Sequence, residues 1–285
     1  MTDLEKKELK RIKKENKLKE KEEKKEVKKA IKLQKEDISF SKADEKEFNK
    51  EEKRNRPLSE KELKIKRLNE PPALPVLEEI GNSVTHGVGA IFGLIALVLL
   101  ILKSDTTLKM VSSIVYGTSI FIMMLMSCLY HAWRSGSRVK RLWRRFDYSS
   151  IYLLICATFA PIQLVDFASH DYTHFVLALV WFSLMWAGAI TGITLTCIFG
   201  PGRIRWLNYP MYFTLGWSGL LFIPGWFIYG YLNLLYWILG GGIVYTSGMI
   251  PFVMRGKTAA HFIWHIFVLL GVVTHFLGIY FCIYS

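Results

Sequence analysis

Apolar residues dominate the chain from about residue 83 to its end, in runs that charged or turn-forming residues separate. A run of about 20 apolar residues is long enough to cross a bilayer as a helix. A lone segment in lipid can satisfy its backbone hydrogen bonds only by being helical. The sequence therefore predicts an all-α fold, a bundle of seven transmembrane helices over residues 83–102, 110–132, 147–165, 174–198, 206–226, 232–253 and 260–282.

The first 70 residues have the opposite character. They hold 25 of the 37 lysines and arginines and 18 of the 24 acidic residues, and Phe40 and Phe48 are their only aromatic residues. We therefore expect two parts, a Lys/Glu-rich cytoplasmic tail over residues 1–70, disordered or partly helical, and a membrane domain over residues 71–285. Acidic residues nearly balance basic ones in the tail, and no nucleic-acid-binding motif is present, so we expect no nucleic-acid partner.

Positive charge is distributed unequally between the connections. Those after the second, fourth and sixth predicted spans contain ten lysines and arginines, and those after the first, third and fifth contain two. Cytoplasmic loops carry the excess of positive charge, so the N-terminus is predicted to be cytoplasmic and the C-terminus outside, in a multi-pass protein of the cell membrane. The loop after the second span is expected to contact anionic lipid through Arg134, Arg138, Lys140, Arg141, Arg144 and Arg145.

Five polar residues fall at one depth on this topology. Ser127 and His131 lie near the end of the second span, Asp147 opens the third, and His261 and His265 open the last. All of these ends are predicted to be cytoplasmic. Ionisable groups at the edge of the hydrocarbon core are costly and usually functional. Residues four apart share a helix face, so each of the two pairs should project together.

Three imidazoles with a nearby carboxylate favour a zinc site that keeps one open position. Zinc with three neutral ligands lowers the pKa of a bound water to about 7. Asp147 could orient or deprotonate that water, and Ser127 could hydrogen-bond a substrate oxygen or a ligand. The alternative is that the histidines bond to backbone carbonyls or to neighbouring helices. The shared depth of all five groups disfavours this alternative.

A second polar stripe precedes the first span. Glu78, Asn82 and His86 are spaced by four and so share one helical face. We expect them to be accessory residues around the metal, with Glu78 or Glu79 capping the site or pairing with the arginine-rich loop. The alternative is a hydrogen-bonded helix entry without a role in the site.

The stretches NSVTHGVG, SCLYHAW, RFDYSSIYLLICATFAP and HFIWH resemble the hemolysin III family. This family is the bacterial branch of the progestin and adipoQ receptor family, which includes the adiponectin receptors. The resemblance covers residues 71–285 and implies that His131, His261 and His265 are the zinc ligands, that Asp147 reaches the metal through water, and that Ser127 completes the motif. The wider superfamily includes the alkaline ceramidases, which implies zinc-dependent cleavage of a lipid amide.

Two functions follow as hypotheses. The first is an intramembrane zinc hydrolase that cleaves an amide or ester bond of a membrane lipid and acts in membrane lipid homeostasis. The second is a non-enzymatic hemolysin III-type membrane protein, in which zinc only holds helices together and the role is lytic or homeostatic. An exchangeable position on the metal would indicate the first function, and four protein ligands would indicate the second.

Overall fold

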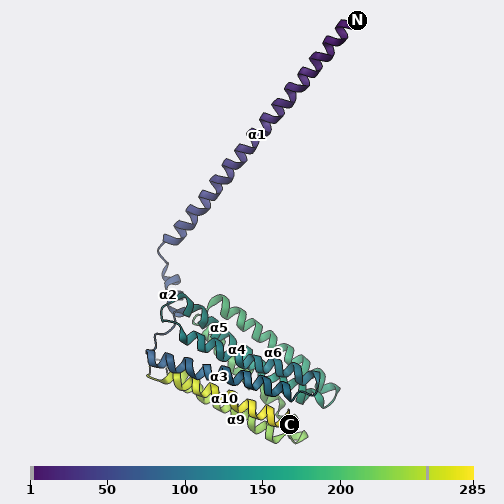
Figure 1. The fold of residues 1–285 in the computed structure, drawn as a ribbon. Helices are drawn as coiled ribbons and strands as arrows, with labels where there is room; N and C mark the ends of the chain where they lie inside the picture. Colours follow the sequence, from purple (N-terminus) through teal and green to yellow (C-terminus); the bar gives the residue numbers. More distant parts are fainter. Residues whose placement is uncertain (1–2, 255–256) are drawn as a thin grey trace. The chain divides into compact units, whose positions relative to one another are not determined.

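The computed structural model describes residues 3–254 and 257–285, and every regular element within these ranges is a helix (Figure 1). The chain divides into two compact units after Glu62. The first unit contains α1 (Asp3–Asn55), and α2 (Glu60–Asn69) begins in it. The described part of the tail is therefore helical over most of its length.

Charged pairs four residues apart run along the exposed surface of α1. Lys24 pairs with Glu20, and Lys32 lies 3.8 Å from Glu36. Each such pair stabilises an exposed helix by about 0.2–0.5 kcal/mol. Apolar packing contributes little here, because the leucine, valine and isoleucine side chains described in the middle of this helix are exposed.

Among the described residues, the second unit contains seven helical segments that are long and apolar enough to cross a membrane. The chain is a multi-pass membrane protein, as its hydropathy predicts. The spans are α3 (Val76–Leu102), α4 (Thr107–Ala132), α5 with its π and 3₁₀ continuation (Arg138–Ser169), α6 (Tyr172–Phe199), α7 to α8 (Arg205–Tyr229), α9 (Leu232–Val253) and α10 (Ala260–Cys282).

Two helices begin earlier than the apolar pattern indicates. The Ser137 hydroxyl accepts a hydrogen bond from the Lys140 amide at 3.0 Å, so α5 starts at Arg138 within the charged segment. Asp147 consequently lies in the third turn of α5 and not in its first turn, as predicted. Likewise, α3 starts directly after Pro75. The polar stripe is therefore part of the first membrane helix.

The fifth span is not one regular helix. It consists of α7 (Arg205–Trp217), a 3₁₀ segment η3 (Ser218–Phe222) and α8 (Ile223–Tyr229). Pro210 lies inside α7, where it removes a backbone donor from the helical ladder. Pro224 lies in the first turn of α8, where a backbone amide would have no partner within that helix.

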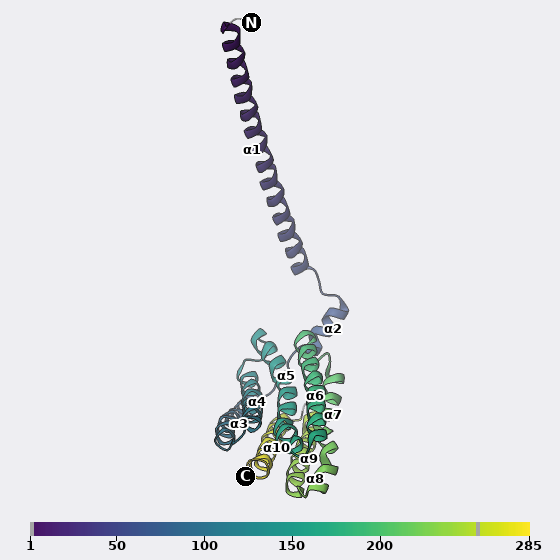
Figure 2. The same ribbon diagram turned by 90° about the vertical axis from the view of Figure 1, so that its right-hand side faces the viewer.

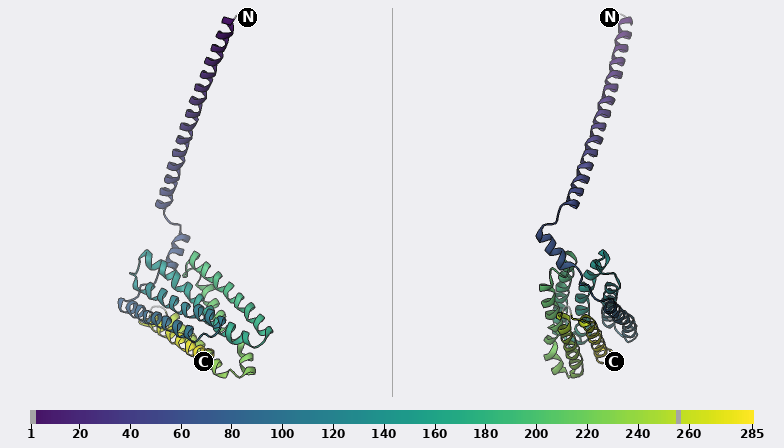
Figure 3. Two further views of the ribbon diagram at one scale, coloured as in Figure 1. Left: turned by 45° about the vertical axis from the view of Figure 1, so that its right-hand side comes forward. Right: turned by 90° about the vertical axis from the view of Figure 1, so that its left-hand side faces the viewer.

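The bundle closes because the last span packs on the first. Helix α3 packs on α4, α4 on α5 and α5 on α6, and α10 packs on both α9 and α3. In Figure 1, α3 in blue and α10 in yellow lie side by side. Figures 2 and 3 show the bundle from further directions. The end of the bundle that holds Ala132, Arg138 and Ala260 is called the basic end below.

Residues 69 and 70 belong structurally to the second unit. The Asn69 side chain donates to the carbonyl of Phe199 at 2.9 Å and accepts from the amide of Arg203 at 3.2 Å. Glu70 forms an ion pair with Arg141 at 3.1 Å. The membrane unit therefore begins before residue 71, which is the position at which the amino-acid composition changes.

The orientation of the bundle remains a proposal from the charge count. Arg255, one of the ten basic residues in that count, lies outside the described residues. In a variant without native cysteines, we expect a membrane-impermeant maleimide to label Ser285→Cys from outside intact cells. Arg134→Cys at the basic end should react only after the membrane is opened. The reverse pattern would invert the topology.

Small residues allow α3 and α4 to approach closely. A Cβ atom added at Gly117 would lie 2.6 Å from the Cα atom of Leu97, and one added at Gly93 would lie 2.7 Å from the amide nitrogen of Phe121. Both neighbouring atoms are backbone atoms, so a larger residue must push the two helices apart.

We therefore expect Gly117→Ala to destabilise the protein by about 1–3 kcal/mol through overpacking. Gly216→Ala in α7 is the matched control, because a Cβ atom there meets nothing within 4 Å. The control should retain or raise the melting temperature of the detergent-solubilised protein. Equal melting temperatures for both variants would contradict the close α3–α4 contact.

Candidate metal centre

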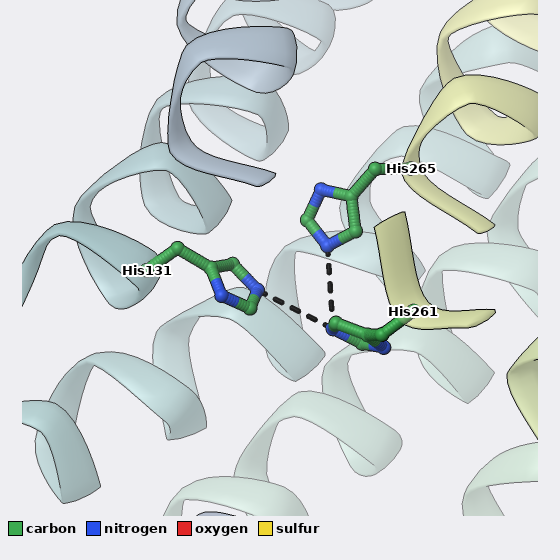
Figure 4. A group of neighbouring side chains, drawn as sticks. All are labelled: His131, His261 and His265. Carbon is green, nitrogen blue, oxygen red and sulfur yellow. Dashed lines mark hydrogen bonds between the residues drawn. The ribbon is translucent and has the colours of Figure 1, made fainter. Parts of the chain in front are cut away.

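Three imidazole rings from two helices converge at the basic end of the bundle (Figure 4). His131 is the second-last residue of α4, and His261 and His265 lie in the first two turns of α10. The Nε2 atom of His261 lies 3.4 Å from Nε2 of His131 and 3.3 Å from Nε2 of His265. The structure thus brings together the three histidines that the sequence places at one depth.

Two of the three separations between these nitrogens suit a tetrahedral metal ion, and all three nitrogens lie within 4.8 Å of one another. Zinc–nitrogen bonds of about 2.0–2.1 Å at tetrahedral angles separate ligand nitrogens by about 3.3–3.4 Å. Both Nε2–Nε2 distances from His261 fall in this range. Among the described residues, this group consists of three imidazoles and contains no thiol. Such a ligand set suits Zn²⁺ and other divalent ions that bind nitrogen ligands. The three histidines could therefore hold a metal ion.

Glu79 determines which nitrogen of His131 faces the cluster. Its Oε2 atom lies 2.6 Å from Nδ1 of His131. A carboxylate can only accept, so Nδ1 carries the proton and the Nε2 lone pair remains for a metal. Oε1 of the same carboxylate accepts a hydrogen bond from Lys140 at 2.8 Å. Of the two glutamates that the sequence left open for pairing with the basic loop, the structure selects Glu79.

Asn82 and His86 face the cluster from α3. Nδ2 of Asn82, a buried residue, lies 3.4 Å from Nδ1 of His131. His86 is also buried, and its Nε2 atom lies 3.3 Å from the backbone oxygen of His265. The His86 and His265 rings have centroids 3.9 Å apart. Both accessory residues therefore contact a member of the histidine cluster.

Glu78 acts at the start of α10. Ala259 precedes this helix with φ 61°, in the left-handed region, and has no side chain to cap it. Oε2 of Glu78 accepts a hydrogen bond from the Ala259 amide at 3.4 Å. A carboxylate at a helix N-terminus is favourable because it faces the unpaired amides. Glu78 thereby ties α3 to the helix that carries His261 and His265.

Asp147 and Ser127 lie beside the histidines and not among them. The Ser127 side chain lies next to the Asp147 carboxyl group. Both residues line a cavity that also contacts His261 and His265. Among the described residues, the ligand group within 4.8 Å contains the three histidines alone. A tetrahedral ion held by three protein ligands keeps a fourth position for water or substrate.

The cavity has a volume of about 200 Å³ and follows the third span from Asp147 in α5 to Ile162 in its π-helical continuation. Away from the basic end its lining is mostly apolar and aromatic, and includes Ile151, Leu154, Phe159, Tyr212, Trp217 and Ile238. His275 also lines it, and its Nε2 atom lies 3.1 Å from the backbone oxygen of Ile238. The cavity is thus polar at the histidines and largely apolar in the interior of the bundle.

The six basic residues expected to contact anionic lipid do not share one environment. Four of them form hydrogen bonds within the protein: Lys140, Arg141, Arg144 and Arg145. Lys140 and Arg144 are also buried, whereas Arg134 and Arg138 are exposed. The inward position of Lys140 had a sequence signal, since it lies seven residues before Asp147 and so on nearly the same helix face.

Comparison with known proteins gives a consistent set of relatives. The family model described as "Haemolysin-III related" matches residues 75–276, which contain all three histidines. Hemolysin-3 of Bacillus cereus is 34% identical over 201 residues, which cover 69% of this chain and 87% of the relative. The Hemolysin-3 homolog of Bacillus subtilis (strain 168) is 30% identical over 204 residues, 69% of this chain and 90% of the relative.

A more distant relative is the human Monocyte to macrophage differentiation factor. It is 24% identical over 212 residues, which cover 71% of this chain and 83% of the relative. The similarity therefore extends from bacterial to mammalian proteins.

The cluster predicts one bound divalent metal ion per chain, to be measured by elemental analysis of purified protein. His265→Ala should lower the metal content toward zero, because only two imidazoles would remain. His174→Ala is the matched control, since its ring pairs with Asp171 outside the cluster. Equal metal content in both variants would argue against the centre.

Proposed function

The chain belongs to the haemolysin-III-related family, and from this basis we propose that it is a zinc-dependent hydrolase of an amide or ester bond in a membrane lipid, active in membrane lipid homeostasis. One observation carries the proposal. Imidazole, carboxyl and hydroxyl groups meet at one end of a largely apolar cavity within the membrane unit. Apolar cavities with a few convergent polar groups are the usual form of small-molecule sites.

A lipid substrate suits both halves of this cavity. Its acyl chain occupies the apolar part along α5, between side chains such as Leu154 and Phe159. Its carbonyl group lies at the polar end, near His261 and His265. A water-soluble substrate would make no apolar contacts with the lining of the cavity. A pure hydrocarbon would make no hydrogen bonds with the polar groups at its end. An amide or ester of a fatty acid matches the two together.

The residues at the polar end have separate tasks. Zn²⁺ supplies Lewis-acid polarisation of the carbonyl group and activation of water at neutral pH. Asp147 accepts a proton from the attacking water and returns it to the amine or alcohol when the bond to the carbonyl carbon breaks. Ser127 lies next to the Asp147 carboxyl group and orients it. Glu79 holds His131 with Nε2 toward the cluster.

The membrane context of the site is also part of the proposal. On the orientation that the charge count favours, the histidines lie near the cytoplasmic face. Arg134 and Arg138 are exposed at this end and are proposed to contact anionic lipid headgroups. The other four basic residues of the segment have partners inside the protein, so we do not assign them this contact.

A non-enzymatic function is the second candidate. It is favoured by the names of two relatives, Hemolysin-3 and Hemolysin-3 homolog. In this case the metal joins α4 to α10 as a structural link, and a lytic or homeostatic effect does not need Asp147. Metal removal would then lower thermal stability, while Asp147→Asn would leave the phenotype intact.

Turnover measurements separate the two candidates. We expect metal-loaded protein in liposomes to release fatty acid from at least one member of a panel of N-acyl and ester lipids. Asp147→Asn should lower this rate by about 100- to 10,000-fold, because it removes the proton acceptor. Its metal content should stay at the wild-type value, because Asp147 is outside the ligand group.

The control for this experiment is His174→Ala, which should retain both metal and turnover. Metal-loaded wild-type protein without activity on the whole panel would contradict the hydrolase. An unchanged rate in Asp147→Asn would remove Asp147 from the mechanism.

A further inference from the structure

Lys140 is a cation without access to solvent in a segment that is otherwise partly exposed. Its side chain is 0% exposed. Its Nζ atom donates to Oε1 of Glu79 at 2.8 Å and to the backbone oxygen of Trp133 at 3.0 Å. It also lies 5.0 Å from the centroid of the Tyr130 ring. A lysine that served a membrane surface would extend its ammonium group to the headgroups, and this one points inward.

The partner of Lys140 is the carboxylate that holds a histidine of the metal centre. Oε2 of Glu79 lies 2.6 Å from Nδ1 of His131, and its Oε1 receives the lysine. Both oxygens are therefore occupied, one by each neighbour. With the two oxygens fixed, the carboxylate cannot rotate about its own axis without breaking a charge-assisted hydrogen bond.

These contacts connect three helices. His131 is on α4, Glu79 on α3 and Lys140 on α5. Asp147 follows Lys140 by seven residues on the same helix, so both lie on nearly one face. The lysine thereby links the helix that carries Asp147 to the helix that carries His131.

We propose that Lys140 is a positioning residue of the metal centre. It fixes Glu79, which in turn keeps the His131 ring turned with Nε2 toward His261 and His265. The inference rests on the proposed metal site, and it adds a residue that neither the family match nor the histidine pattern assigns. Outer partners of a ligating histidine set its orientation, and their loss typically weakens metal affinity by about 10- to 100-fold.

Neighbouring cations do not share this position. Arg138 lies two residues earlier on α5 and is exposed. Arg144 is buried but donates to the backbone oxygens of Asn69 and Glu70. Arg138→Met therefore removes a charge from the same helix without touching Glu79, and it serves as the matched control.

The test is a Co²⁺ titration of the full-length protein in detergent, followed by its visible absorption bands. Lys140→Met should weaken Co²⁺ binding by about 10- to 100-fold and alter the band shape, because the His131 ring is held less firmly. Arg138→Met should bind as wild type. The melting temperature of each metal-free variant shows whether the fold itself has changed.

A double variant controls for the effect of leaving a buried charge without its partner, which could itself disturb the fold. Glu79→Gln should weaken Co²⁺ binding by a factor similar to that of Lys140→Met. The pair Glu79→Gln with Lys140→Met leaves no unpaired charge and should weaken binding no more than either single change, since both act through one contact. The role of Lys140 would be overturned if the double variant weakened Co²⁺ binding by the product of the two single effects. Wild-type Co²⁺ affinity in Lys140→Met would overturn it too. A wild-type protein that binds no Co²⁺ would overturn the metal centre together with it.

Discussion

The packing of α3 against both α4 and α10 is the constraint on which the site depends. His131 and His261 are 130 residues apart in the sequence, and no local interaction brings the three histidines together. Helix α3 contacts both ligand helices with polar groups, through Glu79 at His131 and through His86 at the backbone of His265. Glycine at positions 93 and 117 lets the α3 and α4 backbones approach each other closely.

The polar groups at this end are costly in a membrane unless each has a partner. Burial of an ionisable group without a partner is unfavourable, so such groups gather where they satisfy one another. Glu79, His131 and Lys140 form one such set, and Ser127 lies next to Asp147 at the same end. Their concentration at one end leaves the interior of the bundle free for an apolar cavity. The site therefore combines a charged rim with a lipid-like interior.

A hydrolase and a structural metal protein would share most of this architecture. Both need α4 and α10 held in register and three imidazoles around one ion. They differ in what the surroundings must do, since only a hydrolase requires a cavity beside the metal and a proton acceptor that is not itself a ligand. The cavity lined by Asp147, His261 and His265 is the feature that a structural metal would not need.

The fold could largely be predicted from the sequence, because the lipid bilayer permits few backbone conformations. Each apolar run of membrane-spanning length has to be helical, and seven such segments are present. Helix ends were less predictable. Helix α5 begins at Arg138, in a charged segment that Ser137 caps. A prediction from apolar runs misses this first part of the helix, because its residues are charged. The interruption of the fifth span also escaped the pattern, although Pro224 lies at it.

The sequence by itself determined the membrane helices, and it grouped the three histidines with Asp147 and Ser127 by depth and by their spacing of four. Only the tertiary structure decided which side chains touch. In the structure, Lys140 forms a hydrogen bond with Glu79 and does not extend toward lipid. Glu79, and not Glu78, contacts His131. Asp147 lies outside the group of three histidine ligands. The reason is physical: helix periodicity fixes the face and the height of a residue, whereas its partner depends on how neighbouring helices are rotated and how closely they pack.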